Sequence, residues 1–145
     1  MPNPTPILKP SASPFRGSGG LRHIVHIDLD SFFVSVERMK DSSLNGIPVL
    51  IGGSTDRGVV ASCSYEARKF GIHSAMPMRK AKQLCPHATI IGGDYSAYSK
   101  ASHAVTEIIR KEVPLFEKTS IDEFYIDLTG MDKFYGCYQR ASELR

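Results

Sequence analysis

Two acidic clusters beside short apolar runs constrain this chain more than any other feature of its sequence. Asp28-Leu29-Asp30 closes the run His23–Ile27. Asp122-Glu123 follows 94 positions later (28 to 122), between the short runs Leu115–Thr119 and Phe124–Leu128. Carboxylates at strand ends that are brought together form a hard-oxygen site suited to Mg²⁺, and such a metal beside a phosphate serves phosphoryl and nucleotidyl transfer. Either cluster alone also fits ordinary polar surface, so this chemistry requires a fold that joins them.

The order of predicted elements indicates an α+β fold with an insertion. Hydrophobic periodicity and turn residues predict a strand over 23–29, a helix over 31–40, strands over 48–51 and 58–63, helices over 65–70 and 77–84, a strand over 88–91, a long helix from 94 to about 111, a hairpin of 115–119 and 124–128, and a final helix over 133–145. Without the middle segment this is a ferredoxin-like βαββαβ unit that lacks its last strand. We expect Asp30 or Ser31 to cap the first helix, and Asp94 or Ser96 the long one.

The ends and the bulk composition narrow the class of protein. Residues 1–21 are predicted to be a disordered tail, because Pro, Ser and Gly dominate there and little apolar surface can be buried. The three cysteines are far apart and fit reduced thiols of a cytoplasmic protein. No apolar run is long enough to cross a bilayer, so we expect no membrane contact. The basic residues of 68–82 fit a polyanionic partner, or a merely solvated face.

A second constellation predicts a place for phosphate. Tyr65 and Arg68 are three residues apart and therefore share one helix face. A phenol and a guanidinium near a helix N-terminus suit a triphosphate, to which Ser62 would add a hydroxyl. The same spacing also fits packing plus a surface charge. Phe32 and Phe33 open the first helix, where aromatic residues usually join the core; one of them is free to form a flat wall against a bound sugar.

Four spaced motifs resemble the Y-family translesion DNA polymerases of the bacterial DinB type. They are Ile27–Phe33 with Val36-Glu37, Ser64–Gly71, Ser74–Pro77 and Ser120–Glu123, and the resemblance runs from about Arg22 to the last residue. It implies Mg²⁺-dependent, template-directed DNA synthesis in translesion replication and DNA repair.

The resemblance also implies a role for each site residue. Asp28 and Asp122 are similar to the aspartates that bind two Mg²⁺ ions, assisted by the Leu29 carbonyl, and Glu123 to a third carboxylate that binds metal and is catalytic. Asp30 matches the motif with a structural or capping role. Phe33, beside Phe32, stands at the steric-gate position that excludes a 2′-hydroxyl. Ser62, Tyr65 and Arg68 match triphosphate-binding positions.

The family's architecture assigns residues 22–30 and 94–145 to an incomplete palm and residues 31–93 to a small fingers insertion. The family's thumb and little finger, which grip duplex DNA, have no counterpart here. Expected partners are primer–template DNA, deoxynucleoside triphosphates and, for the full-length protein, a sliding clamp. The alternative is a catalytically inert fragment that binds metal–nucleotide or a protein partner.

Two other enzyme classes share part of the pattern. Phosphatases of the haloacid-dehalogenase type also begin with a strand and Asp-x-Asp, but they require Thr or Val where Phe32 stands. Diguanylate cyclases have a signature similar to Gly92-Gly93-Asp94, but theirs lies in a hairpin, whereas a helix is predicted to follow here.

Overall fold

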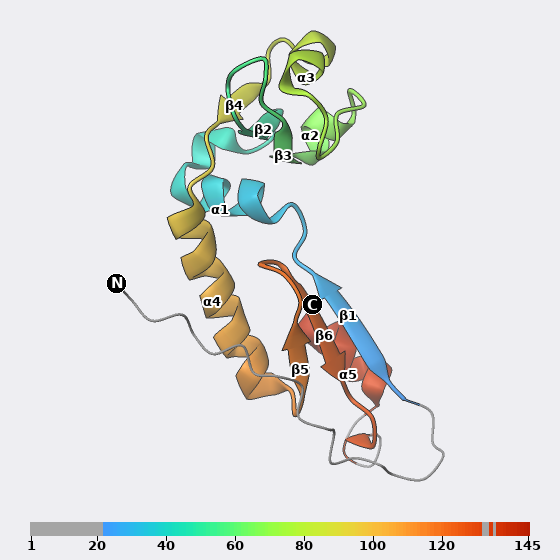
Figure 1. Cartoon of the computed structure of the whole chain (residues 1–145). Helices are drawn as coiled ribbons and strands as arrows, with labels where there is room; N and C mark the ends of the chain where they lie inside the picture. Colours follow the sequence, from blue (N-terminus) through green and yellow to red (C-terminus); the bar gives the residue numbers. More distant parts are fainter. Residues whose placement is uncertain (1–21, 132–133, 135) are drawn as a thin grey trace.

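The computed structural model describes residues 22–131, 134 and 136–145, so the predicted tail of 1–21 and positions 133 and 135 of the predicted helix 133–145 lie outside the described residues. Its elements are, in chain order, β1 (Ile24–Asp28), α1 (Phe32–Lys40), the 3₁₀ turn η1 (Ser42–Leu44), β2 (Val49–Gly52), β3 (Val60–Cys63), α2 (Tyr65–Arg68), α3 (Met78–Leu84), β4 (Thr89–Ile91), α4 (Tyr95–Glu112), β5 (Phe116–Lys118), β6 (Glu123–Asp127) and α5 (Cys137–Leu144) (Figure 1).

The first sheet has the strand order β1-β6-β5, with both pairings antiparallel. Successive side chains of a strand point to opposite faces. One face carries Val25, Ile27, Phe124 and Ile126, which cluster with apolar residues of α4 and α5. The other face carries His26 and Asp28 opposite Tyr125 and Glu123. The sheet is therefore covered by helices on one side and is open on the side that carries charge.

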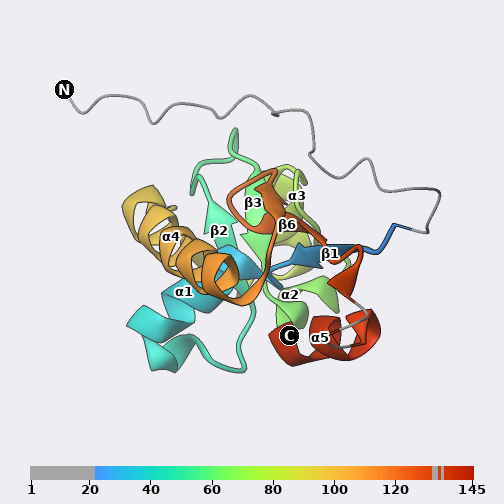
Figure 2. The same ribbon diagram turned by 90° about the horizontal axis from the view of Figure 1, so that it is seen from below.

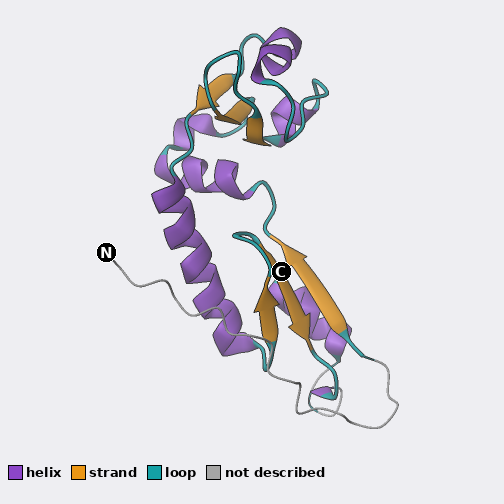
Figure 3. Cartoon of the chain, viewed as in Figure 1, coloured by secondary structure: helices purple, strands orange, loops and turns teal. Residues whose placement is uncertain are grey.

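The second sheet has the strand order β3-β2-β4 and lies at the far end of α4 from the first (Figure 3). β2 and β3 form an antiparallel pair, and β4 joins β2 in parallel. Leu50 and Val60 pack with Met78 and Ala81 of α3 and Ala67 of α2. Two short helices and this sheet thus enclose a core of their own.

A third cluster connects the two sheets. Phe32, Val34 and Val36 of α1 pack with Val49 and Ile51 of β2 and with Tyr98 of α4. The helix α1 contacts both α4 and β2 (Figures 1 and 2). Val34 and Tyr98 are fully buried. The packing of α1 on β2 and on α4 therefore fixes the second sheet relative to α4, which in turn covers the first sheet.

The helix caps confirm some predictions and correct one. Asp94 caps α4 as expected, since its carboxylate accepts from the Ala97 N–H at 3.1 Å. Gly71 has φ +82°, the left-handed conformation expected after α2. The predicted side-chain cap of α1 is wrong: Ser31 is the N-cap residue but its side chain accepts no capping hydrogen bond, because its backbone is left-handed (φ 43°, ψ 45°) rather than extended. Within the described residues, no helix combines the length and the apolar character that crossing a membrane would require.

Candidate nucleotide and metal site

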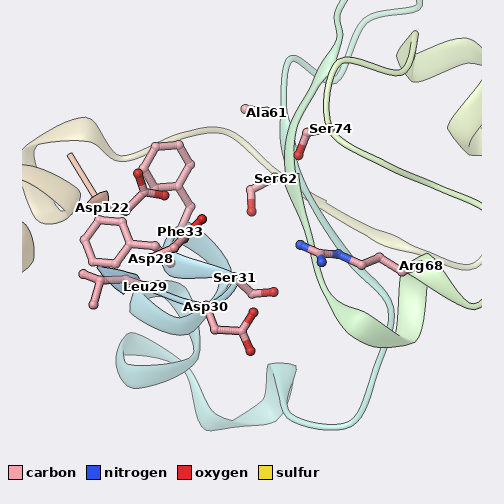
Figure 4. A pocket seen from close by; sticks show the side chains of 11 residues that line it. Asp28, Leu29, Asp30, Ser31, Phe33, Ala61, Ser62, Arg68, Ser74 and Asp122 are labelled. Atoms are coloured by element: carbon pink, nitrogen blue, oxygen red, sulfur yellow. The ribbon is translucent and has the colours of Figure 1, made fainter. Parts of the chain in front are cut away.

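A cleft of about 520 Å³ lies between the two sheets. It is lined from one side by the end of β1 and the start of α1, and from the other by β3, α2 and the loop after α2 (Figure 4). The lining residues are Asp28, Leu29, Asp30, Ser31, Phe32, Phe33, Ala61, Ser62, Arg68, Ser74 and Asp122.

The fold brings the two acidic clusters together. Asp28, the last residue of β1, pairs with Glu123, the first residue of β6. One residue further, the Leu29 N–H donates to the Asp122 carbonyl at 2.9 Å. Asp28 and Asp122 therefore line the same cleft although 94 positions separate them (28 to 122).

Glu123 adjoins this pair but faces the open side of the sheet. Its Oε1 lies 4.0 Å from Nε2 of His26, which stacks on Tyr125 with ring centroids 4.6 Å apart. The Ser120 hydroxyl lies 2.8 Å from Oδ1 of Asp122 and 3.4 Å from Oε2 of Glu123, within donating distance of both. One hydroxyl thus lies close to both carboxylates of the turn, and Glu123 shares the open face of the sheet with Asp28.

The oxygen donors suit a hard divalent cation. Asp28 and Asp122 supply carboxylates and Leu29 supplies a backbone carbonyl at the same edge of the cleft, and such ligands are preferred by Mg²⁺. In the part of the chain that the structure describes, no group of three or more His, Cys, Asp or Glu side chains is already gathered as a metal site.

The opposite wall supplies positive charge and hydroxyls. Arg68 of α2 and Ser62 of β3 both line the cleft across from the aspartates (Figure 4). The short helix that carries Arg68 is fixed at its start, where the Ser64 hydroxyl accepts from the Ala67 N–H at 3.3 Å. It is also fixed by an ion pair of 2.9 Å between Glu66 and Arg38, which holds the pKa of Glu66 below its usual value.

Tyr65 does not line the cleft. Its hydroxyl donates to Oδ1 of Asp30 at 2.6 Å, and this hydrogen bond raises the pKa of the Tyr65 phenol. The Arg68 guanidinium lies 4.8 Å from the centroid of the same ring, a cation–π contact. Asp30 is therefore the acceptor of a bond that joins the start of α1 to α2, instead of the cap of α1.

The two phenylalanines divide between core and cleft. Phe32 is 7% exposed and belongs to the cluster that connects the sheets. Phe33 is half-buried and stacks on Tyr98, with ring centroids 4.3 Å apart and an interplanar angle of 12°. Its orientation is thereby fixed by a neighbour from α4.

Sequence reasoning placed Tyr98 only within the predicted long helix from 94 to about 111 and missed its partners. The Tyr98 hydroxyl donates to the buried Glu37 carboxylate at 2.8 Å, and Lys40 reaches the other oxygen of Glu37 at 3.0 Å. Burial, together with the bond to Glu37, raises the pKa of Tyr98 to about 12. Phe33, which lines the cleft, therefore stacks on a tyrosine that is held by a buried hydrogen-bond network.

Ser31, Ala61 and Ser74 also line the cleft and were not predicted as site residues. The Ser31 hydroxyl is buried without a hydrogen-bond partner, and its left-handed backbone is unusual for a residue with a Cβ. Ser74 belongs to the motif Ser74–Pro77, which was the available signal. Ser31 stood inside the first motif, but no local pattern indicated its conformation.

Comparisons with known proteins agree with this geometry. Residues 27–145 match the model of the impB/mucB/samB family. The chain is 44% identical over 119 residues to DNA polymerase IV of Treponema denticola, covering 82% of this chain and 30% of that protein. DinB of Sulfolobus solfataricus superposes with a TM-score of 0.76 at 30% identity, covering 83% of this chain and 36% of the other.

A Y-family DNA polymerase chimera gives a TM-score of 0.77 at 29% identity, over 83% of this chain and 37% of its own. The chain thus spans about a third of the length of these relatives. The expected α+β fold and the resemblance to DinB-type polymerases are both confirmed. By its sequence and its fold, the chain belongs to the impB/mucB/samB family of Y-family DNA polymerases.

Proposed function

We propose that this chain is an N-terminal portion of a translesion DNA polymerase and carries the residues for Mg²⁺-dependent nucleotidyl transfer. The observation that supports this most is a single cleft lined by Asp28 and Asp122 on one wall and by Arg68 and Ser62 on the other. A nucleoside triphosphate needs both: cation ligands near its reacting phosphate and a guanidinium near its terminal phosphates.

Asp28, Asp122 and the Leu29 carbonyl are the proposed ligands of two Mg²⁺ ions, with Glu123 as the third, catalytic carboxylate. Bound magnesium would activate the attacking 3′-oxygen and neutralise the departing pyrophosphate. Arg68 and Ser62 would hold the triphosphate, and Tyr65 would join them after leaving Asp30. In the reaction the primer 3′-oxygen bonds to the α-phosphorus, the bond to pyrophosphate breaks and the 3′-hydroxyl proton is lost.

Phe33 is the proposed steric gate, with Phe32 packed behind it. The stack of Phe33 on Tyr98 keeps its ring in one orientation, as a wall that rejects a 2′-hydroxyl requires. Segment 31–93 would cover the nascent base pair as fingers, and segments 22–30 and 94–145 would form the palm. Primer–template DNA is the proposed partner, and a sliding clamp is a proposed partner of the longer protein.

Nucleotide binding by the chain itself tests the site. A deoxynucleoside triphosphate with Mg²⁺ should raise the melting temperature, and chelation of the metal with EDTA should abolish the rise. Asp122→Asn and Arg68→Ala should each raise the half-saturating nucleotide concentration about 10-fold or more, since each removes a charged contact. Lys111→Ala, an exposed change at the end of α4, is the matched control. A wild-type chain that shows no metal-dependent shift would refute the proposal.

Primer extension separates the polymerase from an inert binding module. The inert alternative is favoured by the short span of the chain, because affinity for DNA grows with the number of phosphate contacts. Extension by the longer polymerase that is lost in Asp122→Ala supports catalysis at this site. Binding of metal–nucleotide by the 145-residue chain without any extension would identify a binding module.

Sugar discrimination tests Phe33 on its own. In the longer polymerase, Phe33→Ala should admit ribonucleotides while deoxynucleotide incorporation continues, because only the wall against the 2′-hydroxyl is removed. The control is Phe70→Ala, an exposed aromatic residue that makes an edge-to-face contact with His87 and does not line the cleft. Equal sugar selectivity in Phe33→Ala and wild type would remove Phe33 from this role.

A further inference from the structure

A lysine outside the cleft is held in an unusual environment beneath the acidic turn. Lys118 ends β5, and its ammonium donates to Oγ of Ser102 and, at 3.1 Å, to Oγ1 of Thr106. Both hydroxyl residues belong to α4 and are buried, at 1% and 7% exposure. Burial lowers the pKa of Lys118, and its ammonium forms no ion pair with a carboxylate among the described residues.

This lysine fixes the direction of two hydroxyl protons. An ammonium can only donate, so the Ser102 hydroxyl must accept from Lys118 and is left with one proton to give. That proton goes to the Ile121 carbonyl. By the same logic the Thr106 hydroxyl accepts from Lys118 and donates to the Ser102 carbonyl at 2.7 Å. The result is a directed chain of hydrogen bonds from Lys118 to the turn.

The end of this chain is the peptide that precedes Asp122. Its carbonyl, that of Ile121, is held by Ser102. The carbonyl of the following peptide, that of Asp122, accepts from the Leu29 N–H at 2.9 Å. Both peptide planes that flank the Asp122 Cα are therefore anchored, one to α4 and one to the end of β1. Two anchored planes restrict both backbone dihedrals of Asp122, and with them the origin of its side chain.

We propose that Lys118, acting through Ser102, is a positioning residue that sets the backbone of Asp122 in the metal-binding geometry. The functional half of this inference rests on the proposed nucleotidyl-transfer site; the positioning itself rests on the hydrogen bonds alone. Lys118 touches neither substrate nor metal. Burying a charged ammonium costs free energy. In return, the buried ammonium fixes the orientation of the Ser102 hydroxyl.

Amide hydrogen exchange in the ligand-free chain tests the positioning directly. The Leu29 amide reports on the Asp122 carbonyl, and the Thr119 amide, which donates to the Glu123 carbonyl at 3.1 Å, reports on the turn. Lys118→Met keeps an apolar chain of similar length but removes the donor. Exchange at Leu29 and Thr119 should quicken about 10-fold relative to Ile126 in the middle strand, as expected for one lost hydrogen bond. Ser102→Ala should do the same.

Two further variants and a second readout separate positioning from general loss of stability. Lys118→Arg keeps a donor-only cation and should preserve most of the protection. Lys111→Met changes an exposed lysine of α4, the helix that carries Ser102, and should match wild type. With nucleotide present, the half-saturating Mg²⁺ concentration should rise about 10-fold in Lys118→Met, while nucleotide stabilisation at saturating Mg²⁺ returns.

The outcomes are distinguishable. Equal acceleration of the Leu29, Thr119 and Ile126 amides in Lys118→Met would overturn the inference, because it would show a general loss of stability. Unchanged protection at Leu29 and Thr119 would overturn it as well. If the wild-type chain shows no Mg²⁺-dependent nucleotide binding, the proposed function fails, and the exchange comparison still decides whether Lys118 positions the turn.

Discussion

Single residues around the cleft depend on partners that are distant in sequence. Tyr98 and Glu37 are 61 positions apart, and Tyr65 and Asp30 are 35 apart. No local spacing rule reports on such pairs, so the sequence could place Tyr98 on a helix face but could not give its hydroxyl a partner. Asp28 and Asp122 were predictable as a pair because each ends or borders a strand, and adjacent strands bring their ends together.

Alkaline pH should weaken the fold through Tyr98. Its pKa is raised from 10.0 to about 12 by burial and by the bond to Glu37. The unfolded tyrosine ionises first, so this stabilisation is complete below pH 10 and is lost as the pH rises toward 12. The total is about 2 to 3 kcal/mol in the free energy of unfolding. Denaturant titrations of wild type and Tyr98→Phe between pH 9 and 11.5 measure the difference, since other groups titrate in both.

The Tyr98→Phe variant separates the pH-dependent contribution of the Tyr98 phenol from that of the other titrating groups. In Tyr98→Phe the slope of stability against pH should be shallower over this range than in wild type. At pH 7 the same variant should be less stable by about 1 to 3 kcal/mol, because Glu37 loses a donor in a buried place. Parallel curves for the two proteins would show that the Tyr98 phenol ionises as it does in the unfolded chain.

Ser31 should be a site where removal of a polar group stabilises the protein. Its hydroxyl is buried without a partner, and a buried unsatisfied polar group costs about 1 to 3 kcal/mol. Ser31→Ala keeps the Cβ and therefore the same backbone strain, so urea denaturation should show a gain of about 1 kcal/mol. Ser35→Ala removes a satisfied hydroxyl that donates to the Asp30 carbonyl at 3.2 Å, and it should give no gain. A loss of stability in Ser31→Ala would contradict the assignment.

At the scale of elements, periodicity predicted every described strand and the α-helices within a few residues. Strands such as β1 and β6 are recognisable because more exposed and less exposed residues alternate along them. The start of α1 was predicted to within one residue, but its side-chain cap was not, because the left-handed backbone of Ser31 has no signature in the residue type. The parallel addition of β4 to β2 was not predictable from order alone.

The cap of α4 offers a test at this scale. Asp94 caps the helix through the Ala97 N–H and pairs with Lys40 at 2.9 Å. Asp94→Ala should lower the melting temperature by about 5 °C at pH 7. Ser96→Ala, within the first turn and exposed, is the control that should change little. The Lys40 bond holds the pKa of Asp94 below 3.8, so its stabilisation is present above that pH and is lost as the pH falls. Equal melting temperatures for Asp94→Ala and Ser96→Ala would show that the Asp94 cap does not stabilise the protein.

At the scale of the whole molecule, the cleft depends on the contacts that fix the position of one sheet relative to the other. The α1 side chains Phe32, Val34 and Val36 pack on both β2 and α4. Two polar links also run between α1 and the neighbouring elements, Arg38 to Glu66 at 2.9 Å and Tyr65 to Asp30 at 2.6 Å. The shared core predicts that neither sheet unfolds alone.

Cooperative unfolding can be tested at Val34, which is fully buried in the shared cluster. Val34→Ala should lower the free energy of unfolding by about 2 kcal/mol. Exchange of the Ile126 amide in the first sheet and of the Leu50 amide in the second should quicken by the same factor. The control, Ile108→Ala, alters an exposed side chain of α4 and should leave both amides nearly unchanged. Acceleration in one sheet only would show two independent units.

The pairing of Asp28 with Glu123 has a consequence for error in folding. Because side chains alternate along a strand, a slip of β1 against β6 by one residue would bury the carboxylates and expose Val25 and Ile27. The apolar core therefore disfavours every slip by an odd number of residues, because each such slip exchanges the two faces of β1. The packing that stabilises the first sheet therefore also fixes Asp28 beside Glu123 at the edge of the cleft.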